Sequence, residues 1–557
     1  MNETRAVAGH RRAASALRAL GVDHLFGVMG IGNIHVVADH VELGGRYVAT
    51  RHEAGAVNMA DGAHRATGGL GVATVIQGPG LTNAITAITT AARSRSSLLV
   101  LTSDLPLAPV PTGQSYDQEP LIATTGAAYE RVEGTDPGHA LLRAAHRART
   151  ERRPVVVSLP ERVQVATFPD EPLVPIEPAT EPVEPREEDV ARLAELLAGA
   201  NRPVLLAGRG AVDAGAADGL AALAERTGAL LGTTLVAKDL FAGRPGNLGI
   251  VGGFAHALAR RLLRDADLVV GGGGSLSVWT AKGRKLFPDA TLVQSDHDAR
   301  AFDGPTRPDV TVLADAGLLT AALLDRCAGP PAPGWSDDGA HDRLARRRPE
   351  DDLTGDGPAE PQAAAAAGGL DPRRVCVALG EHLPPGRRLT TDSGHHFGFP
   401  AQHVPVDHPD RYHHTSTFGA IGQGLGVAIG AAFVGPPRTS VVVLGDGGLA
   451  TSIADLETAV RERAPVLVVV LDDRAYGAEI HHLRRAGIPD ELGRFDGTDL
   501  TAVARGFGCE AVEVATLEEL AAAVAGWSGV DPLVVTVPID GDVLARWYDE
   551  VLPPAGH

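Results

Sequence analysis

The feature that most constrains the fold of this chain is a repeated alternation of short apolar runs with segments of helical periodicity. Three runs fall in each part of the sequence: "GVATVIQGPG", "SLLVLTSD" and "PVVVSLP", then "PVLLAGRG", "ADLVVGGGG" and "ATLVQSD", then "TSVVVLGDGG", "PVLVVVLDD" and "PLVVTVPID". Strands that are apolar on both faces belong to buried parallel sheets, whose crossover connections are helices. The pattern predicts an α/β fold of doubly wound parallel sheets.

Two segments rich in proline and charge interrupt this rhythm, residues 168–189 and 328–370, and we interpret both as linkers. They leave blocks 1–167, 190–327 and 371–557, which predict three α/β domains. The first and third blocks share a Gly-rich turn after a core strand, which suggests that these two are related.

Composition narrows the classes of function. The formal charge is 50 − 69 = −19 and no Lys/Arg-rich block exists, so nucleic acid and anionic membranes are not expected partners. Three cysteines are too few for a disulfide framework. The first residues predict an amphipathic helix ended by Gly21 and followed by a strand, not a signal peptide. No apolar run reaches the roughly 18 residues of a membrane span, so we expect a soluble, cytoplasmic protein.

Carboxylates follow two of the apolar runs in the third block. Gly445-Asp446-Gly447-Gly448 ends one run, and Asp472 and Asp473 end the next; between them Ile453, Leu456, Ala459 and Val460 fall at helical spacing. The right-handed crossover of such a βαβ unit brings both strand ends to one edge of the sheet. Glycines there let the backbone approach a phosphate, and two carboxylates beside a phosphate suit Mg²⁺. A lone Gly-Asp-Gly is more often only a turn.

Gly-Asp-Gly, a spacer of 24 residues (Gly448 to Leu471) and a pair of short polar residues resemble the signature of the thiamin-diphosphate-dependent enzymes. The resemblance extends along essentially the whole chain, in the order of the acetolactate-synthase-like group: pyrimidine-binding, central Rossmann-like and diphosphate-binding domains. It implies that Asp446 and Asp473 bind Mg²⁺ through side chains and Ala475 through its carbonyl. The diphosphate end would also include Gly445, Gly447, Gly448, Tyr476 and Gly477.

One departure concerns the metal end itself. The family usually has Asn-Asn where this chain has Asp472-Asp473, which keeps an oxygen ligand and adds a negative charge. We expect Asp472 to point the other way, as a hydrogen-bonding residue at the strand end.

The pyrimidine end is implied by two further segments. "RHEAGAVNMADGAHRATG" resembles the family segment with the catalytic glutamate, here Glu53, which would hydrogen-bond the aminopyrimidine ring. "QGPGLTNAITAI" supplies Gly78, Pro79 and Asn83 beside that ring. Alone, Glu53 would only complement a helix dipole, and Gly-Pro-Gly would only be a turn. The segment "PTGQSYDQEPLIATTGAAYERV" places Gln114 on the family's catalytic-loop glutamine.

Two segments of the third block complete the predicted site. In "TSTFGAIGQGLGVAIGAA" the Gly419 carbonyl would accept from the 4′-amino group, and Ile421 would be the bulky residue that holds the cofactor bent. In "TTDSGHHFGFPAQH" the residues Gly394, His395 and His396 would contact the diphosphate. His482, or its neighbour His481, is a candidate substrate-side group. None of the histidine pairs shows the spacing of a structural zinc site.

The substrate end departs from acetolactate synthases. Where acetolactate synthases have an aromatic residue before the glutamine, this chain has Gly113. Where they have a lysine further on, this chain has Ala127. Ile31, Asn33 and His35 in "FGVMGIGN" would lie near the thiazolium. In the central block, Gly271-x-Gly273 leads to Leu276 and Gly208-x-Gly210 leads to Asp213, so neither completes a dinucleotide fingerprint. FAD stays open, but a structural central domain is favoured.

The resemblance implies a thiamin-diphosphate- and Mg²⁺-dependent carboligase or lyase. It would decarboxylate a 2-oxo acid and transfer the acyl-anion equivalent to a carbonyl acceptor, as a homodimer at least and more typically a homotetramer. Three alternatives stay open: a simple 2-oxo acid decarboxylase, a 2-hydroxy ketone lyase, and a non-catalytic diphosphate-binding assembly protein.

Overall fold

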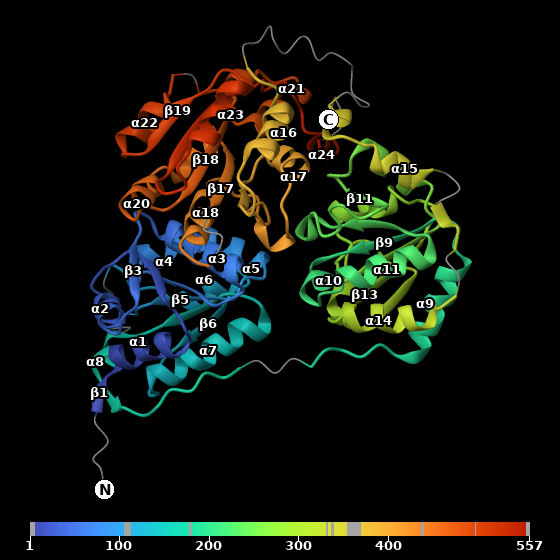
Figure 1. The fold of residues 1–557 in the computed structure, drawn as a ribbon. Helices are drawn as coiled ribbons and strands as arrows, with labels where there is room; N and C mark the ends of the chain where they lie inside the picture. Colours follow the sequence, from blue (N-terminus) through green and yellow to red (C-terminus); the bar gives the residue numbers. More distant parts are fainter. Residues whose placement is uncertain are drawn as a thin grey trace.

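Three parallel six-stranded sheets, each interleaved with helices, make up the protein (Figure 1), and this confirms the predicted α/β class. The computed structural model describes residues 6–104, 113–177, 181–329, 332–335, 339–353, 369–435, 439–495 and 497–552. All nine apolar runs named above form strands of these sheets. Residues 168–189 and 328–370 connect successive sheets, and the domain boundaries placed there stay predictions.

The first sheet has the strand order β3-β2-β4-β5-β7-β6. Its strands are β2 (His24–Gly27), β3 (Arg46–Ala49), β4 (Gly71–Thr74), β5 (Leu98–Thr102), β6 (Ala128–Arg131) and β7 (Val155–Ser158), and a small antiparallel pair joins β1 (Ala6–Ala8) to β8 (Thr167–Pro169). The helices are α1 (Gly9–Ala19), α2 (Ile34–Glu42), α3 (Glu53–Thr67), α4 (Pro79–Asn83), α5 (Ile85–Arg93), α6 (Gln118–Ala123), α7 (Pro137–Glu151) and α8 (Glu161–Val165).

The third sheet repeats that topology, because its order β16-β15-β17-β18-β20-β19 has the same sequence of neighbours. This agreement supports the relation inferred from the shared rhythm. The strands are β15 (Arg388–Thr391), β16 (Tyr412–His414), β17 (Ser440–Gly445), β18 (Val466–Asp472), β19 (Glu510–Glu513) and β20 (Leu533–Pro538). The helices are α16 (Pro372–His382), α17 (Gly398–His403), α18 (Gly424–Ala432), α19 (Asp446–Ser452), α20 (Asp455–Arg461), α21 (Gly477–Arg485), α22 (Leu500–Gly506), α23 (Leu517–Gly526) and α24 (Arg546–Asp549).

The central sheet differs, with the order β11-β10-β9-β12-β13-β14 that is typical of nucleotide-binding folds. Its strands are β9 (Pro203–Ala207), β10 (Leu230–Thr233), β11 (Asn247–Ile250), β12 (Leu268–Gly272), β13 (Thr291–Asp296) and β14 (Val310–Leu313). The helices are α9 (Glu187–Gly199), α10 (Arg209–Asp213), α11 (Ala217–Thr227), α12 (Ala257–Arg264), α13 (Val278–Ala281), α14 (Ala316–Arg326) and α15 (Ala340–Ala345).

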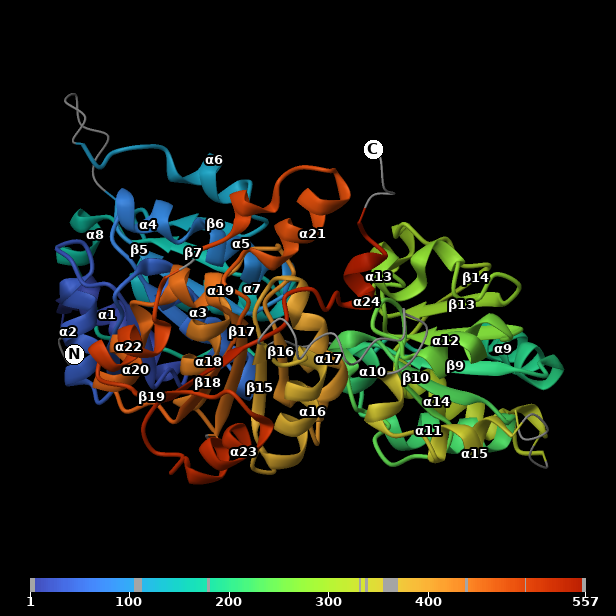
Figure 2. The same ribbon diagram turned by 90° about the horizontal axis from the view of Figure 1, so that it is seen from above.

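The first and third domains share a hydrophobic core, whereas the central domain lies to their side in both ribbon views (Figures 1 and 2). Helices α3 and α18 form the centre of that shared core, where Gly62 and Gly430 bring the two backbones close together. A Cβ on Gly430 would lie 1.9 Å from the Met59 carbonyl oxygen, so no other residue fits there.

Two expectations about elements need correction. The helix expected after Asp446 is two helices, α19 and α20, separated by Ile453 and Ala454. The second expected linker is partly packed: Trp335 is buried in the central core and its indole donates to the Pro203 carbonyl at 2.8 Å. An isolated tryptophan in a Pro- and Gly-rich stretch gives no periodicity from which to predict this.

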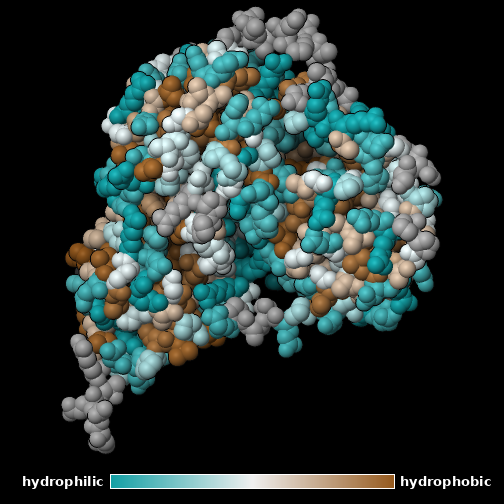
Figure 3. Space-filling view, in the orientation of Figure 1, coloured by the Kyte–Doolittle hydropathy of each residue, from teal (hydrophilic) through white to brown (hydrophobic). Residues whose placement is uncertain are grey.

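The surface is mixed in character. Hydrophilic residues cover much of the face in Figure 3, with apolar residues interspersed. In the part of the chain that the structure describes, no helix combines the length and apolarity required to cross a membrane.

Candidate functional site

The first group of candidate residues lies at one edge of the third sheet, at the ends of three neighbouring strands. β15, β17 and β18 are adjacent and parallel, so the turns that follow them meet at the same edge. Gly394, His395 and His396 follow β15; Asp446 follows β17; Asp473 follows β18. The expected juxtaposition of the two aspartates follows from this order of strands.

The electrostatics of the two aspartates favour a cation between them. Burial, together with the charge of Asp473, raises the pKa of Asp446 to about 7. A buried carboxylate whose ionisation is opposed by a neighbouring carboxylate is stabilised in its charged form by a divalent ion. Among the residues that the structure describes, no cluster of three or more His, Cys, Asp or Glu side chains could hold a metal alone. Such an ion would therefore need oxygen ligands besides these two side chains.

Asp472 has the separate role that strand alternation predicts. It is buried, and its carboxylate accepts the backbone N–H of Arg474 at 3.0 Å. Burial raises the pKa of Asp472, and this backbone hydrogen bond opposes the rise. The bond fixes the tight turn 472–474, in which Arg474 adopts a positive φ of 54°. Asp472 thus stabilises the loop that presents Asp473.

Glycines line this edge where a side chain would obstruct it. A Cβ on Gly477 would lie 2.2 Å from Asp473 Oδ2, and a Cβ on Gly448 would lie 2.4 Å from Asp392 Oδ2. Gly447 lies against the ring of Tyr476, which itself packs on Phe495 with ring centroids 4.5 Å apart. Ala475 forms an antiparallel β-bridge with Arg494, so the loop that carries Asp473 is paired along its backbone. Gly445 approaches the His396 ring closely, with a Cβ there only 3.3 Å from it.

The histidines that follow β15 are buried and have unused polar atoms. His395 Nδ1 and His396 Nε2 have no hydrogen-bond partner among the residues that the structure describes, and His395 Nε2 lies 3.9 Å from Asp473 Oδ2. Burial lowers the pKa of His396 to about 3, so its ring is neutral near pH 7 and can donate through one nitrogen. Gly394 adopts a φ of +128°, which only glycine tolerates easily, and this conformation begins the turn.

The two histidines of α21 differ from the expectation for His482. His482 is exposed and packs on Tyr548, whereas His481 is buried with its ring 4.9 Å from that of His395. The inward position therefore belongs to His481, because α21 turns its neighbour to the outer face.

A segment between β16 and α18 carries Gly419 and Ile421, and Asp392 holds its end. The Asp392 carboxylate accepts the backbone N–H groups of Gly422, Gln423 and Gly424 at 2.6, 3.0 and 2.9 Å. Sequence reasoning missed Asp392, although it lies within the quoted segment "TTDSGHHFGFPAQH". Ile421 contacts the Gly447 turn, and Gly419 has a positive φ of 84°.

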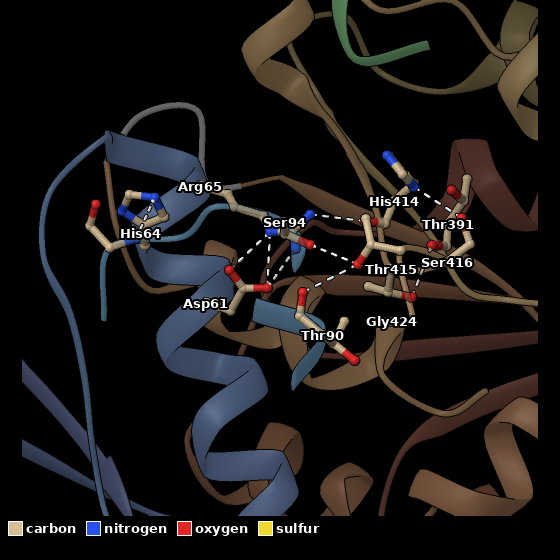
Figure 4. A network of polar contacts seen from close by, with 12 residues as sticks. Asp61, His64, Arg65, Thr90, Ser94, Thr391, His414, Thr415, Ser416 and Gly424 are labelled. Carbon is tan, nitrogen blue, oxygen red and sulfur yellow. Dashed lines mark hydrogen bonds and ion pairs between the residues drawn. The ribbon is translucent and has the colours of Figure 1, made fainter. Parts of the chain in front are cut away.

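Polar contacts tie the same segment to the first domain (Figure 4). Arg65 of α3 pairs with Asp61 at 2.7 Å and donates to the His414 carbonyl at 2.9 Å. The Thr415 hydroxyl donates to Asp392 at 3.0 Å. Helix α3 and the segment 414–424 are thereby fixed relative to one another.

The second group of candidates lies at the edge of the first sheet. Glu53 is the first residue of α3 and is half-buried; its Oε2 accepts from Asn83 Nδ2 at 3.0 Å. A Cβ on Gly80 would lie 3.4 Å from Glu53 Oε1, so the turn that contains Gly78 and Pro79 passes beside the carboxylate. The structure thus brings together the residues predicted for the pyrimidine end.

Gln114 joins this second group through a residue that sequence reasoning did not single out. Gln77 Nε2 donates to Gln114 Oε1 at 3.1 Å, and the Gln114 side chain packs on Gly78, where a Cβ would lie 2.9 Å away. The position of Gln77 in "QGPG", directly before the turn, was the available signal.

The residues expected at the substrate end divide into two sets. Ile31 is 83% exposed, and no described residue lies within 4 Å of a Cβ built on Gly113, so both could face a ligand. Asn33 is buried: its Oδ1 accepts the Gly30 N–H, and its Nδ2 donates to the Val28 carbonyl and the Thr74 hydroxyl. His35 stacks on His10. Ala127 lies in the core beside β6. Asn33 is thus a structural residue of the loop, and Ala127 cannot take the place of a substrate-binding lysine.

The two Gly-rich turns of the central domain pack against each other. A Cβ on Gly208 would lie 2.3 Å from the Gly273 carbonyl oxygen, and a Cβ on Gly210 would lie 2.8 Å from Gly273 Cα. This mutual packing explains these glycines without a nucleotide.

Models of one protein family match a part of each of the three domains. The thiamine pyrophosphate enzyme N-terminal TPP binding domain matches residues 8–124, the central domain matches residues 190–323, and the C-terminal TPP binding domain matches residues 392–537. A probable 2-ketoarginine decarboxylase from Pseudomonas aeruginosa is 30% identical over 90% of this chain and 88% of its own length. An acetolactate synthase large subunit from Parasynechococcus marenigrum is 29% identical, with 93% and 85% covered. A sulfoacetaldehyde acetyltransferase from Castellaniella defragrans is 27% identical, with 91% and 88% covered.

Proposed function

The chain belongs to the family of thiamine pyrophosphate enzymes, and from this premise we propose that it decarboxylates a 2-oxo acid and transfers the resulting acyl-anion equivalent to a carbonyl acceptor. The observation that carries the proposal is the meeting of Asp446 and Asp473 at the ends of β17 and β18, beside glycines and buried histidines. A diphosphate and Mg²⁺ suit this edge, because together they supply the charge and the ligands that the two carboxylates lack.

The residues present fit the cofactor. His395 and His396 offer buried ring nitrogens without a protein partner, and Gly447 and Gly448 leave the backbone accessible at the start of α19. Asp446 and Asp473 would hold Mg²⁺ with the Ala475 carbonyl. Thiamin diphosphate supplies the electron sink for decarboxylation when it is bound.

Glu53 is the proposed proton-transfer residue of the pyrimidine end. Its carboxylate is oriented by the Asn83 amide, which donates to Oε2, and Oε1 is the oxygen that would face a ligand. Gln114 and Ile31 would face the substrate, and Ile421 would support the cofactor from the side of the Gly447 turn.

We infer that the active unit holds two chains. No hydrogen bond or ion pair between described residues joins the second group of candidates, around Glu53, to the first group, around Asp446. A second copy would complete each group, so a homodimer is the minimum and a homotetramer is the expected assembly. A cytoplasmic location stays a prediction.

Simple decarboxylation is the second candidate, and the likeness to a probable 2-ketoarginine decarboxylase favours it. The substrate end also differs from the one that the resemblance to acetolactate synthases implies, because Ala127 lies buried where their lysine is expected. The names of the relatives include both transfer and decarboxylation, so both stay under test.

The test is a panel of 2-oxo acids incubated with the protein, thiamin diphosphate and Mg²⁺, with products identified by mass spectrometry. We expect a carboligation product from at least one donor paired with an aldehyde or second 2-oxo acid. Aldehydes as the sole products across the panel would overturn the transfer step and leave the decarboxylase.

A further inference from the structure

We propose that Trp547 is a positioning residue for the cofactor's diphosphate end, acting through the C-terminal segment Asp540–Leu552. The inference rests on the proposed function, but this segment lies beyond residue 537, where the match to the C-terminal TPP binding domain ends. It follows β20 and contains α24, which lies beside α13 of the central domain (Figure 2).

Trp547 holds the backbone of the turn that carries the paired histidines. Its indole N–H donates to the His395 carbonyl at 3.0 Å, and the side chain is only 8% exposed. The ring packs against Phe397 and Phe254, with centroids 4.8 and 5.5 Å away. A Cβ on Gly398 would lie 2.3 Å from the indole, so glycine is required there to admit the ring.

The same segment contacts the second loop of the site. A Cβ on Gly541 would lie 3.2 Å from the Cβ of Asp473, so the chain passes directly against that aspartate. The Tyr548 hydroxyl donates to the Ala478 carbonyl at 3.3 Å, in the first turn of α21. The segment therefore fixes the turn after β15 and the loop after β18 relative to each other.

The segment is anchored at its far end in the central domain. The Glu550 carboxylate pairs with Arg260 and Lys282, and the Trp547 ring lies 5.9 Å from that of Trp279. The central domain thus supports the diphosphate end from a distance, although its own Gly-rich turns only pack on one another.

One geometric consequence concerns His395. Its backbone is held by Trp547, its ring lies 5.9 Å from the Tyr548 ring, and its Nε2 lies 3.9 Å from Asp473. Release of the carbonyl frees the turn to move away from Asp473, which weakens binding of the diphosphate and its metal together.

The test is calorimetric titration of thiamin diphosphate at saturating Mg²⁺ into the full-length protein and its Trp547→Phe variant. Phenylalanine keeps an aromatic ring in the cluster and removes only the N–H donor. The loss of one such hydrogen bond predicts a dissociation constant raised about five-fold. The activation constant for thiamin diphosphate should rise equally, while kcat at saturating cofactor stays within about two-fold.

Trp335→Phe is the matched control. Its indole is also buried and also donates to a backbone carbonyl, that of Pro203 at 2.8 Å, in the central core. Both variants should lower the thermal midpoint of the cofactor-free protein, but only Trp547→Phe should weaken cofactor binding. Equal weakening in the two variants would overturn the inference, since it would then report general loss of stability.

Glu550→Gln provides a second variant, because it removes the charge that anchors the segment and leaves the indole in place. We expect weaker cofactor binding in the same direction, and unchanged binding would overturn the inference if Trp547→Phe fails to fold. A wild-type protein that binds no thiamin diphosphate would refute the proposed function and this inference with it. Tight binding by both wild type and Trp547→Phe would refute this inference alone.

Discussion

Asp446 and Asp473 lie at the ends of neighbouring strands, and burial with the charge of Asp473 raises the pKa of Asp446. Asp473→Asn keeps an oxygen ligand and restores the residue usual in the family, so Mg²⁺-dependent binding of thiamin diphosphate should be retained within about ten-fold. Asp473→Ala removes the ligand and should abolish Mg²⁺-dependent binding. Calorimetry with and without Mg²⁺ separates the two variants. Equal loss in both would exclude Asp473 as a metal ligand.

Asp455 is a second residue whose ionisation has a measurable effect. It is buried between Gly55 of α3 and Gly426 of α18, its Oδ1 has no hydrogen-bond partner, and burial raises its pKa to about 7. The folded protein holds a proton there that the unfolded chain has released above about pH 4. Stability from this group is therefore complete at low pH and is lost as the pH rises toward 7, by an amount on the order of 3 kcal/mol.

Asp455→Asn removes this titration. The unfolding free energy of the variant, relative to wild type, should increase between about pH 4 and pH 7, because over this range the unfolded wild-type chain releases a proton that the folded protein retains. Denaturant unfolding at several pH values measures the difference. A difference that does not change with pH would show that Asp455 is not protonated in the folded protein.

At the scale of elements, the start of α18 depends on one side chain. Asp392 accepts three backbone N–H groups at the turn that leads into this helix. Asp392→Ala leaves these buried donors unpaired and should lower the unfolding free energy by about 2–4 kcal/mol. The turn also carries Ile421, so cofactor binding should weaken as well.

Asp315→Ala is the control for that prediction. Asp315 caps α14 in the central domain by accepting from Gly317 and Leu318 at 2.8 and 3.1 Å. It should lower stability by a smaller amount and leave cofactor binding unchanged. A loss of cofactor affinity in Asp315→Ala as large as in Asp392→Ala would contradict a specific role for the turn.

The elements also show where sequence reasoning succeeds. Strands β17 and β18 are unbroken apolar runs, so their burial and their common edge follow from pattern and handedness alone. The break between α19 and α20 leaves the helical spacing intact on both sides, so periodicity did not reveal it. Asp392 and Trp547 act through backbone atoms of distant residues, and no local pattern encodes such contacts.

At the scale of the whole molecule, the proposed division of the site between two chains can be tested by mixing. A heterodimer of Glu53→Gln and Asp446→Ala subunits would contain one site with both substitutions and one site with neither. The purified heterodimer should have about half of wild-type activity, because one of its two sites is intact, although each variant alone is inactive. Co-expression with two affinity tags and an assay of the purified heterodimer measures this. No recovery would place each complete site within one chain.

The order of the three sheets, and the relation between the first and third, could be predicted from sequence because short apolar runs alternate with helical segments in each block. The packing of the C-terminal segment against the central domain was not, because Glu550 meets Arg260 and Lys282 across 268 or more residues of chain (550 − 282 = 268). The substrate could not be predicted from sequence, because Ile31 and Gly113 are exposed and no packing among the described residues fixes their identity.

The measurement that tests the central claim most directly compares wild type with Glu53→Gln on the 2-oxo acid panel, with thiamin diphosphate and Mg²⁺ present. We predict that both proteins bind the cofactor, that wild type consumes at least one 2-oxo acid, and that Glu53→Gln is slower by about 10²–10⁴-fold. If both bind thiamin diphosphate and neither consumes any acid of the panel, the protein is not the enzyme proposed.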